Sequence, residues 1–252
     1  MLQITRKGVS ISMISKRLYA LQFKTRNSFD ENLSTLKSLI SKCREDSVIL
    51  APEVCLTNFC YQRMDEASEF AKVATEELLA LSRDRTIVLS MIEKNRLEYF
   101  NNLKVFHHGE MTHKQSKSRL FPLGDEHNHF SAGSEAEIVP FEVDGIKCGA
   151  INCFELRFTE LWNRVRGCEL IFVPAQWGKE RKDHFETLTK ALAITSQAFV
   201  LTSDGANDNM ARGSAVISPF GIVTKDDEKD IIFLDADLSE IKKVRRYINV
   251  GL

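Results

Sequence analysis

The 252-residue chain is poor in cysteine, and its six cysteines form no CxxC pair. Small secreted domains held by disulfides contain many more, so a disulfide scaffold is excluded. We expect free thiols and a reducing compartment, the cytoplasm. Proline, with 5 residues, and glycine, with 12, are scattered singly as turn residues. This pattern excludes collagen, flexible linkers and low-complexity segments.

The chain also lacks net charge and long apolar runs. Its 34 basic and 35 acidic residues give a net charge of -1, so it has no positive field to attract nucleic acid. No apolar stretch reaches the roughly 18 residues of a membrane-spanning helix. Residues 1–16, MLQITRKGVSISMISK, lack a convincing signal-peptide core and cleavage site. We expect a soluble protein that binds neither nucleic acid nor membranes and carries no export signal.

What the sequence does contain is an alternation of short apolar runs with longer amphipathic segments, which is typical of α/β proteins. The length suits two ordinary domains or one large α/β or sandwich domain. We interpret residues 1–252 as one domain, with residues 1–16 as a candidate N-terminal extension. Strands are predicted at 17–23, 46–50, 86–92, 170–174, 199–202, 214–217 and 231–236, and hairpins at 99–111 and 137–151. One helix is predicted to begin after a cap at residues 27–28, and others at 65–83, 159–165 and 183–196.

The two halves of the chain share the order strand, helix, strand, and in each half a reactive side chain follows the second strand. Glu53 follows the run VILAP, and Cys153 follows GAIN. This weak internal duplication predicts two similar sheets packed face to face, with helices outside.

Local pattern alone leaves two interpretations open for each of these side chains. Cys153 lies at a strand end, where α/β folds form crevices, so it could be a nucleophile. Free cysteine is also among the most buried residue types and can be a plain core residue. Glu53 could be a general base with a raised pKa, or an exposed glutamate at the end of its strand.

Two other polar segments are equally ambiguous. Lys117 lies in the basic run KQSKSR, which usually indicates a solvated loop. Glu126 lies in GDEHNHF, which on its own indicates a polar surface loop. His127 and His129 lie beside Asp125 there, but their spacing matches no zinc template, so no metal is predicted.

Taken together, these segments resemble the nitrilase, or carbon–nitrogen hydrolase, superfamily. Glu53 in APEVCLTNF, Lys117 in KSRLFP and Cys153 in INCFELRF match the order and context of its Glu-Lys-Cys triad. Glu126 matches the family's second glutamate, which precedes an F-x-x-G turn. The resemblance continues through LIFVPAQW, GSAVISPFG and LDADLSEIKKVRR and covers residues 17–247.

The resemblance implies a four-layer αββα sandwich of two mixed sheets, assembled as a homodimer or a higher homo-oligomer. It implies an enzyme that cleaves a non-peptide carbon–nitrogen bond through a thioester on Cys153. Glu53 would be its general base and acid. Lys117 and the backbone N–H of Phe154 would hold the oxyanion, and Glu126 would orient Lys117. This chemistry requires water but no cofactor.

The turn CFELRF is closer to the C-Y-D-x-R-F of ω-amidase-like enzymes than to the C-W-E of true nitrilases. The resemblance therefore implies a small carboxylated amide as substrate, with ammonia and a carboxylic acid as products. Phe154, Arg157, Gln176 and Trp177 are the implied substrate-binding residues. Glu155 is expected to pair with Arg157 beside the nucleophile.

Two alternative functions stay open. The first is an N-carbamoyl amino acid or amine hydrolase, similar to β-ureidopropionase. The second is a nitrilase-like binding protein with little turnover, because Leu192 and Thr195 stand where the family has an Arg and a Glu. The missing charged pair predicts altered support of the pocket or the subunit interface and leaves the triad intact.

Overall fold

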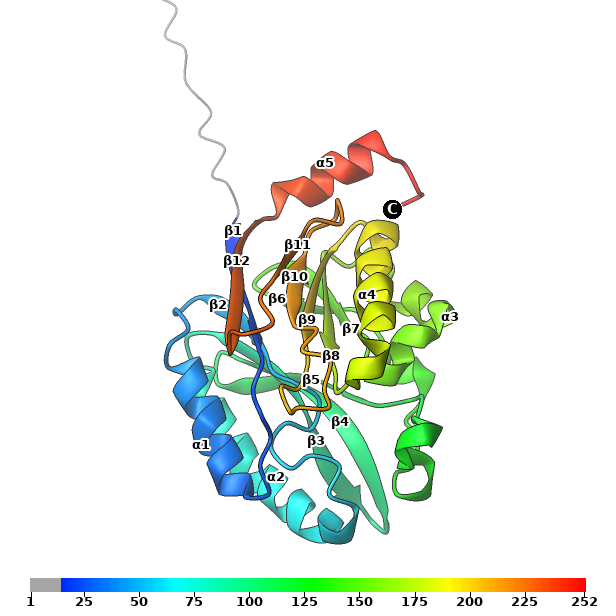
Figure 1. Cartoon of the computed structure of the whole chain (residues 1–252). Helices are drawn as coiled ribbons and strands as arrows, with labels where there is room; N and C mark the ends of the chain where they lie inside the picture. Colours follow the sequence, from blue (N-terminus) through cyan, green and yellow to red (C-terminus); the bar gives the residue numbers. More distant parts are fainter. Residues whose placement is uncertain (1–14) are drawn as a thin grey trace, which may run out of the picture.

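The computed structural model describes residues 15–252, whose strands form two six-stranded sheets (Figure 1). The first sheet has the order β12-β1-β2-β3-β4-β5, and the second has the order β11-β10-β9-β8-β7-β6. The first contains β1 (Ser15–Leu21), β2 (Ser47–Leu50), β3 (Thr86–Asn95), β4 (Glu98–His107), β5 (Glu110–Ser116) and β12 (Ile231–Asp237). The second contains β6 (Phe141–Val143), β7 (Ile146–Ala150), β8 (Leu170–Pro174), β9 (Phe199–Ser203), β10 (Ala215–Ile217) and β11 (Val223–Lys225).

Both sheets are mixed and repeat one arrangement. In each, three central strands are parallel: β1, β2 and β3 in the first sheet, and β7, β8 and β9 in the second. The outer strands of both sheets pair antiparallel. The two similar sheets expected from the internal duplication are therefore confirmed.

The sandwich buries apolar side chains in layers, because successive residues of a strand point to opposite faces. Leu18 and Ala20 of β1 belong to the core between the sheets, whereas Tyr19 and Leu21 belong to the core under the helices. Across the interior, the second sheet contributes Cys148, Ala150, Leu170, Phe172, Phe199, Leu201 and Val216.

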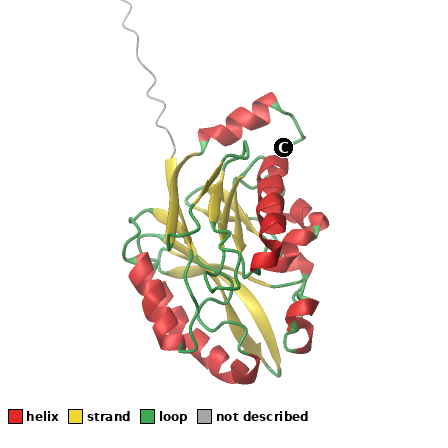
Figure 2. Cartoon of the chain, viewed as in Figure 1, coloured by secondary structure: helices red, strands yellow, loops and turns green. Residues whose placement is uncertain are grey.

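Helices cover the outer faces of the two sheets (Figure 2). α1 (Phe29–Ile40) and α2 (Met64–Leu81) pack on the first sheet, and α3 (Thr159–Trp162) and α4 (Lys182–Ser196) pack on the second. α5 (Ser239–Tyr247) follows β12. This is the predicted αββα sandwich. Single 3-10 turns lie at Tyr61–Arg63, Pro122–Gly124, Glu126–Asn128, Glu135–Glu137, Cys153–Arg157, Asn163–Val165 and Lys179–Arg181.

Several elements differ from the sequence prediction. The predicted hairpin with a turn near Gly109 is confirmed as β4 and β5, but β4 also pairs along its whole length with β3. That second hairpin turns at Arg96, a non-glycine residue with φ of 58°, so no Asn-Gly or Asp-Gly signal marked it. The helix predicted at 159–165 is α3 followed by a 3-10 turn. β5 extends to Ser116, five residues beyond the predicted hairpin, and β11 and α5 were not predicted.

Two further expectations concern the N-terminal extension and membrane-spanning helices. Residues 1–14 of the candidate extension lie outside the described residues, while Ser15 and Lys16 already belong to β1. Among residues 15–252, no helix is both long and apolar enough to cross a membrane.

Candidate active site

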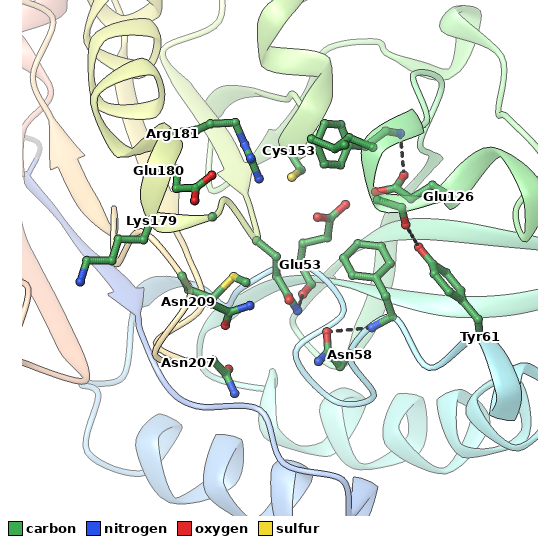
Figure 3. Close-up of a pocket in the computed structure, with 17 residues that line it drawn as sticks. Glu53, Asn58, Tyr61, Glu126, Cys153, Lys179, Glu180, Arg181, Asn207 and Asn209 are labelled. Atoms are coloured by element: carbon green, nitrogen blue, oxygen red, sulfur yellow. Dashed lines mark hydrogen bonds between the residues drawn. The ribbon is translucent and has the colours of Figure 1, made fainter.

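The polar residues singled out in the sequence converge because each follows the C-terminal end of a strand. Glu53 follows β2, Lys117 follows β5 directly, and Cys153 follows β7. The backbone N–H of Glu53 donates to the carbonyl of Ala175, just beyond β8, at 3.3 Å, which joins the two sheets at this end of the sandwich. Figure 3 shows the resulting pocket, with the Cys153 sulfur directed into it.

The backbone at Cys153 adopts a conformation that non-glycine residues rarely take. Its φ is 51°, in the left-handed region, and it begins the 3-10 turn Cys153–Arg157. Such a conformation costs of order 1 kcal/mol or more and persists where the surrounding structure enforces it. It turns the chain sharply at the strand end and directs the thiol toward the pocket.

Glu155 enforces this turn from within it. One carboxylate oxygen accepts the backbone N–H of Asn152 at 2.7 Å, and the other accepts the N–H and hydroxyl of Ser118 at 2.6 and 2.8 Å. The fully buried side chain therefore ties the segment that precedes Cys153 to the segment that follows Lys117. The expected pairing of Glu155 with Arg157 is wrong.

Lys117 lies between two carboxylates. Its ammonium donates to Oε1 of Glu53 at 2.7 Å and to Oε1 of Glu126 at 2.8 Å, and the Lys117 side chain has no exposed surface. A buried charge is costly unless it is paired and hydrogen-bonded, and this one is paired twice. The solvated-loop interpretation of Lys117 and the surface-loop interpretation of Glu126 are therefore both wrong.

The electrostatics of this cluster leave the ammonium charged and the sulfur protonated. Burial by itself lowers the pKa of Lys117, but the neighbouring carboxylates of Glu53 and Glu126 outweigh burial and raise it. Burial, and then Glu53, raise the pKa of Cys153 well above its ordinary value, which Lys117 only partly offsets. The resting sulfur is thus a thiol that needs a base before it can attack.

Glu53 is held in place as such a base requires. The amide of Asn101 donates to its Oε1 at 2.8 Å, and the amide of Gln176 donates to its backbone carbonyl at 2.7 Å. Its second oxygen, Oε2, is buried and has no hydrogen-bond partner among the described residues. One carboxylate oxygen is therefore fixed by Lys117 and Asn101, while the other is free to accept a proton. The exposed-glutamate interpretation of Glu53 is wrong.

Glu53, Glu126 and Cys153 border a cavity of about 830 Å³. It is lined by Glu53, Asn58, Phe59, Tyr61, Phe121, Leu123, Gly124, Glu126, Cys153, Gln176, Gly178, Lys179, Glu180, Arg181, Asn207, Asn209 and Met210. The wall combines aromatic rings with amides and charged groups, as in sites for small polar ligands. The Tyr61 hydroxyl donates to the carbonyl of Gly124, and its ring stacks on His129 at 4.0 Å between centroids, which braces the loop that carries Glu126.

The implied substrate-binding residues divide between two neighbouring spaces. Gln176 lines the main cavity. Phe154, Arg157 and Trp177 instead line a small adjoining pocket that they share with Gln176, Cys153 and Arg181. The Arg157 guanidinium lies 4.6 Å from the Trp177 ring centroid.

Sequence reasoning missed much of the cavity wall. Arg181 borders both spaces, and Lys179, Asn207 and Asn209 border the main one. The only local signal for Arg181 was the charged run GKERK after the strand that ends at Pro174, and such a run usually indicates a solvated surface.

The unusual helix residues Leu192 and Thr195 have a simple structural account. Leu192 is fully buried in the apolar core between α4 and the second sheet. The Thr195 hydroxyl donates to the carbonyl of Ala191 at 2.8 Å within the helix. An apolar contact and an intrahelical hydrogen bond therefore occupy positions where the family has a charged pair.

Comparisons with known proteins identify the family of the chain. The family profile described as carbon-nitrogen hydrolase matches residues 17–246. The 2-oxoglutaramate amidase of Bacillus subtilis is 30% identical over 235 residues, which is 87% of this chain and 90% of that protein. The mouse omega-amidase NIT2 is 25% identical over 262 residues, covering 94% of each chain.

A solved structure agrees as well. That of Saccharomyces cerevisiae Nit3, a member of the nitrilase superfamily, superposes with a TM-score of 0.82 at 18% identity, covering 94% of this chain and 96% of that one. This likeness shows the shared fold. With a family match over nearly the whole described region, the chain belongs to the carbon-nitrogen hydrolase family.

Proposed function

We propose that this chain hydrolyses the ω-amide of a small dicarboxylic monoamide through a thioester on Cys153, releasing ammonia and the carboxylic acid. The observation that carries the proposal is the fully buried Lys117 ammonium, bonded to Glu53 and Glu126 in the wall of the cavity that Cys153 enters. Fold stability does not require a charged triplet of this kind beside a thiol, whereas amide cleavage uses each member.

The first chemical step is attack on the amide carbon. Oε2 of Glu53 accepts the thiol proton as the Cys153 sulfur bonds to the carbonyl carbon, whose oxygen gains the negative charge. Lys117 and the backbone N–H of Phe154 then stabilise this oxyanion, at about 3 to 4 kcal/mol for one such donor. Glu126 keeps the ammonium of Lys117 in position through its 2.8 Å contact.

The second and third steps reuse the same carboxyl group. Protonated Glu53 gives its proton to the amide nitrogen as the carbon–nitrogen bond breaks, so ammonia leaves and a thioester remains. Glu53 next removes a proton from water as the water oxygen attacks the thioester. The intermediate collapses to the carboxylic acid, and the proton returns from Glu53 to the Cys153 sulfur.

The cavity also favours a substrate that carries a carboxylate. Arg181 borders it and forms no salt bridge with any other residue in 15–252. Arg157 and Arg181 line the same small pocket, and partial burial, and then the positive charge of Arg181, lower the pKa of Arg157. A substrate carboxylate would relieve this repulsion and accept hydrogen bonds from a planar guanidinium.

The named relatives support the same substrate class. Besides the 2-oxoglutaramate amidase and the mouse omega-amidase, an Escherichia coli protein named omega-amidase YafV is 33% identical over 138 residues. That match covers 52% of this chain, so it adds less weight than the other two.

Ammonia release from a substrate panel tests the proposal. The panel contains short ω-monoamides of dicarboxylic acids, N-carbamoyl amino acids and simple nitriles, each incubated with the native protein, with Cys153→Ala and with Cys60→Ala. Cys60 is a half-buried thiol that does not line the cavity, so its variant is the matched control. We expect release from an ω-monoamide that only Cys153→Ala abolishes.

The other outcomes contradict the proposal in different ways. Release from carbamoyl compounds alone would assign the chain to the carbamoyl hydrolases. No release from any compound, together with slow alkylation of Cys153 by iodoacetamide, would indicate a binding protein instead of an enzyme.

We also propose that the chain is one domain that works as a cytoplasmic homodimer. All six cysteines are free thiols, which suits a reducing compartment. Ile194 on α4 and Phe220 and Ile222 in the turn beside it are 46, 46 and 66% exposed, an apolar surface suited to a second copy of the chain. Light scattering should give twice the 28.7 kDa chain mass. Replacing Ile222 with a charged residue should reduce the measured mass to that of one chain.

A further inference from the structure

A second group of polar side chains lies at the far end of the sandwich from Cys153. His107 ends β4 and His108 begins the turn into β5, whereas Asp144 lies in the turn between β6 and β7. Lys117 follows the other end of β5, and a seven-residue strand is about 23 Å long. The group is therefore well separated from the proposed active site and joins a hairpin of one sheet to a hairpin of the other.

Both imidazole rings converge on one carboxylate oxygen. The Nε2 atoms of His107 and His108 each lie 3.3 Å from Oδ1 of Asp144. One ligand atom from each of the three residues lies within 4.8 Å of the other two. A tetrahedral zinc ion with bonds of about 2.0 to 2.1 Å sets its ligand atoms roughly 3.3 to 3.4 Å apart. Both Nε2–Oδ1 separations match that spacing.

The outer nitrogens of the rings fix which atoms face the carboxylate. Nδ1 of His108 lies 3.4 Å from the carbonyl of Arg83, and Nδ1 of His107 lies 2.9 Å from the hydroxyl of Thr86. A carbonyl only accepts, so Nδ1 of His108 carries a hydrogen, and Nε2 is the ring atom that faces Asp144. With both Nδ1 atoms bonded to the protein, the two Nε2 atoms and Oδ1 of Asp144 are the atoms placed to bind a cation.

The surroundings suit a divalent ion. The other oxygen of Asp144, Oδ2, accepts from Lys16 at 2.6 Å, and Lys16 also bonds Asp46. Asp46 offsets the charge of Lys16, so the carboxylate of Asp144 keeps a negative charge to attract a cation. Partners on the outer atoms of metal ligands, such as Thr86 here, orient the rings and are a common feature of built metal sites.

We propose that His107, His108 and Asp144 bind one zinc-class divalent ion, with water in the fourth position. Two imidazole nitrogens and a carboxylate oxygen are ligands that zinc prefers. The ion would tie the β4–β5 hairpin of the first sheet to the β6–β7 hairpin of the second. Its role is structural, because the group does not border the cavity that contains Cys153.

The test uses the Cys153→Ala protein, because zinc also binds reactive thiolates. Equilibrium dialysis against micromolar zinc, followed by elemental analysis, should give one zinc per chain. Adding His108→Ala or Asp144→Asn should weaken binding by tenfold or more, whereas the control His127→Ala, at an exposed histidine outside the group, should not. His108 is 64% exposed in its side chain, so its removal should leave the thermal midpoint in EDTA unchanged.

Two further readouts make the result decisive. Zinc at 100 times its dissociation constant should raise the thermal midpoint of the Cys153→Ala protein by about 5 to 10 °C, and His108→Ala should remove that rise. Cobalt(II) bound in place of zinc should show no thiolate charge-transfer band. No zinc binding by the Cys153→Ala protein, unchanged binding after His108→Ala, or a thiolate band would each overturn the proposal.

Discussion

Replacing Glu155 with glutamine should disturb both the stability of the chain and the geometry of its proposed active site. The buried carboxylate accepts hydrogen bonds at both oxygens, from Asn152 at 2.7 Å and from Ser118 at 2.6 and 2.8 Å. In Glu155→Gln, one oxygen becomes an NH₂ group. Whichever way the amide is turned, that group faces a backbone N–H, and two donors cannot bond.

The magnitude follows from the bond that is lost. A hydrogen bond to a charged group contributes about 1.5 to 3 kcal/mol, and the stranded N–H adds to the loss, so we expect a destabilisation of about 2 to 4 kcal/mol. Because Asn152 precedes Cys153 and Ser118 follows Lys117, the nucleophile and the ammonium should shift relative to each other. Misplacement by about 1 Å can cost a hundredfold in rate, so kcat should fall by about 10 to 100-fold with KM nearly unchanged.

Urea unfolding and steady-state ammonia release measure these two effects. Glu142→Gln, at an exposed position on β6, is the matched control and should change neither. The kinetics are measured at a temperature where both variants remain folded, so that loss of folded protein does not lower kcat. If Glu155→Gln unfolds within about 0.5 kcal/mol of the native chain and keeps its kcat, the positioning argument is refuted.

Three other substitutions test separate parts of the account. Lys117→Met should lower kcat by at least about 1000-fold, because it removes an oxyanion donor and leaves the negative charges of Glu53 and Glu126 without a positive partner. A rate of ammonia release within tenfold of the native rate would contradict this. Arg181→Met should raise KM for an ω-monoamide about 10 to 100-fold and leave uncharged amides unaffected, and equal effects on both would exclude carboxylate recognition. Burial raises the pKa of Asp204 to about 7, so this group contributes stability that is present below its unfolded pKa and is lost as the pH rises through about 7. Urea unfolding at about pH 5 and pH 8 should show a loss of roughly 2 to 3 kcal/mol that Asp204→Asn removes, and an identical pH dependence in the variant would contradict the assignment.

The sequence was informative about the fold wherever apolar periodicity is strong. Val48 to Leu50 and Leu170 to Val173 are buried on both faces and were predicted as strands from their apolar runs. α5 was missed because only Ile241 and Val244 of its nine residues are buried, and a stripe of two residues is too weak a pattern against its many charges.

The candidate site shows a different limit of sequence reasoning. Glu53 and Cys153 could be placed at strand ends because that position depends on local order. The burial of Lys117 could not be predicted from neighbouring residues, since it depends on Glu53, 64 positions away in the chain. Only the resemblance to a family connected them. Glu155 and Arg157 are close in sequence, yet the 3-10 turn directs their side chains to different partners.

The proposed metal site illustrates the same limit. His107 and His108 are adjacent and match no metal-binding spacing by themselves. Asp144 joins them only because the β6–β7 turn of the second sheet lies against the β4–β5 turn of the first. A contact between two hairpins from different sheets leaves no local signal in the sequence.

The central claim is that a thioester forms on Cys153, and mass spectrometry of the quenched enzyme tests it most directly. After rapid mixing with an ω-monoamide that the protein turns over, the peptide that contains Cys153 should carry the mass of the substrate minus ammonia. Cys153→Ala should show neither the adduct nor turnover, and Cys60→Ala should show both. Turnover that persists in Cys153→Ala, or an acyl group found on another residue, would contradict the account.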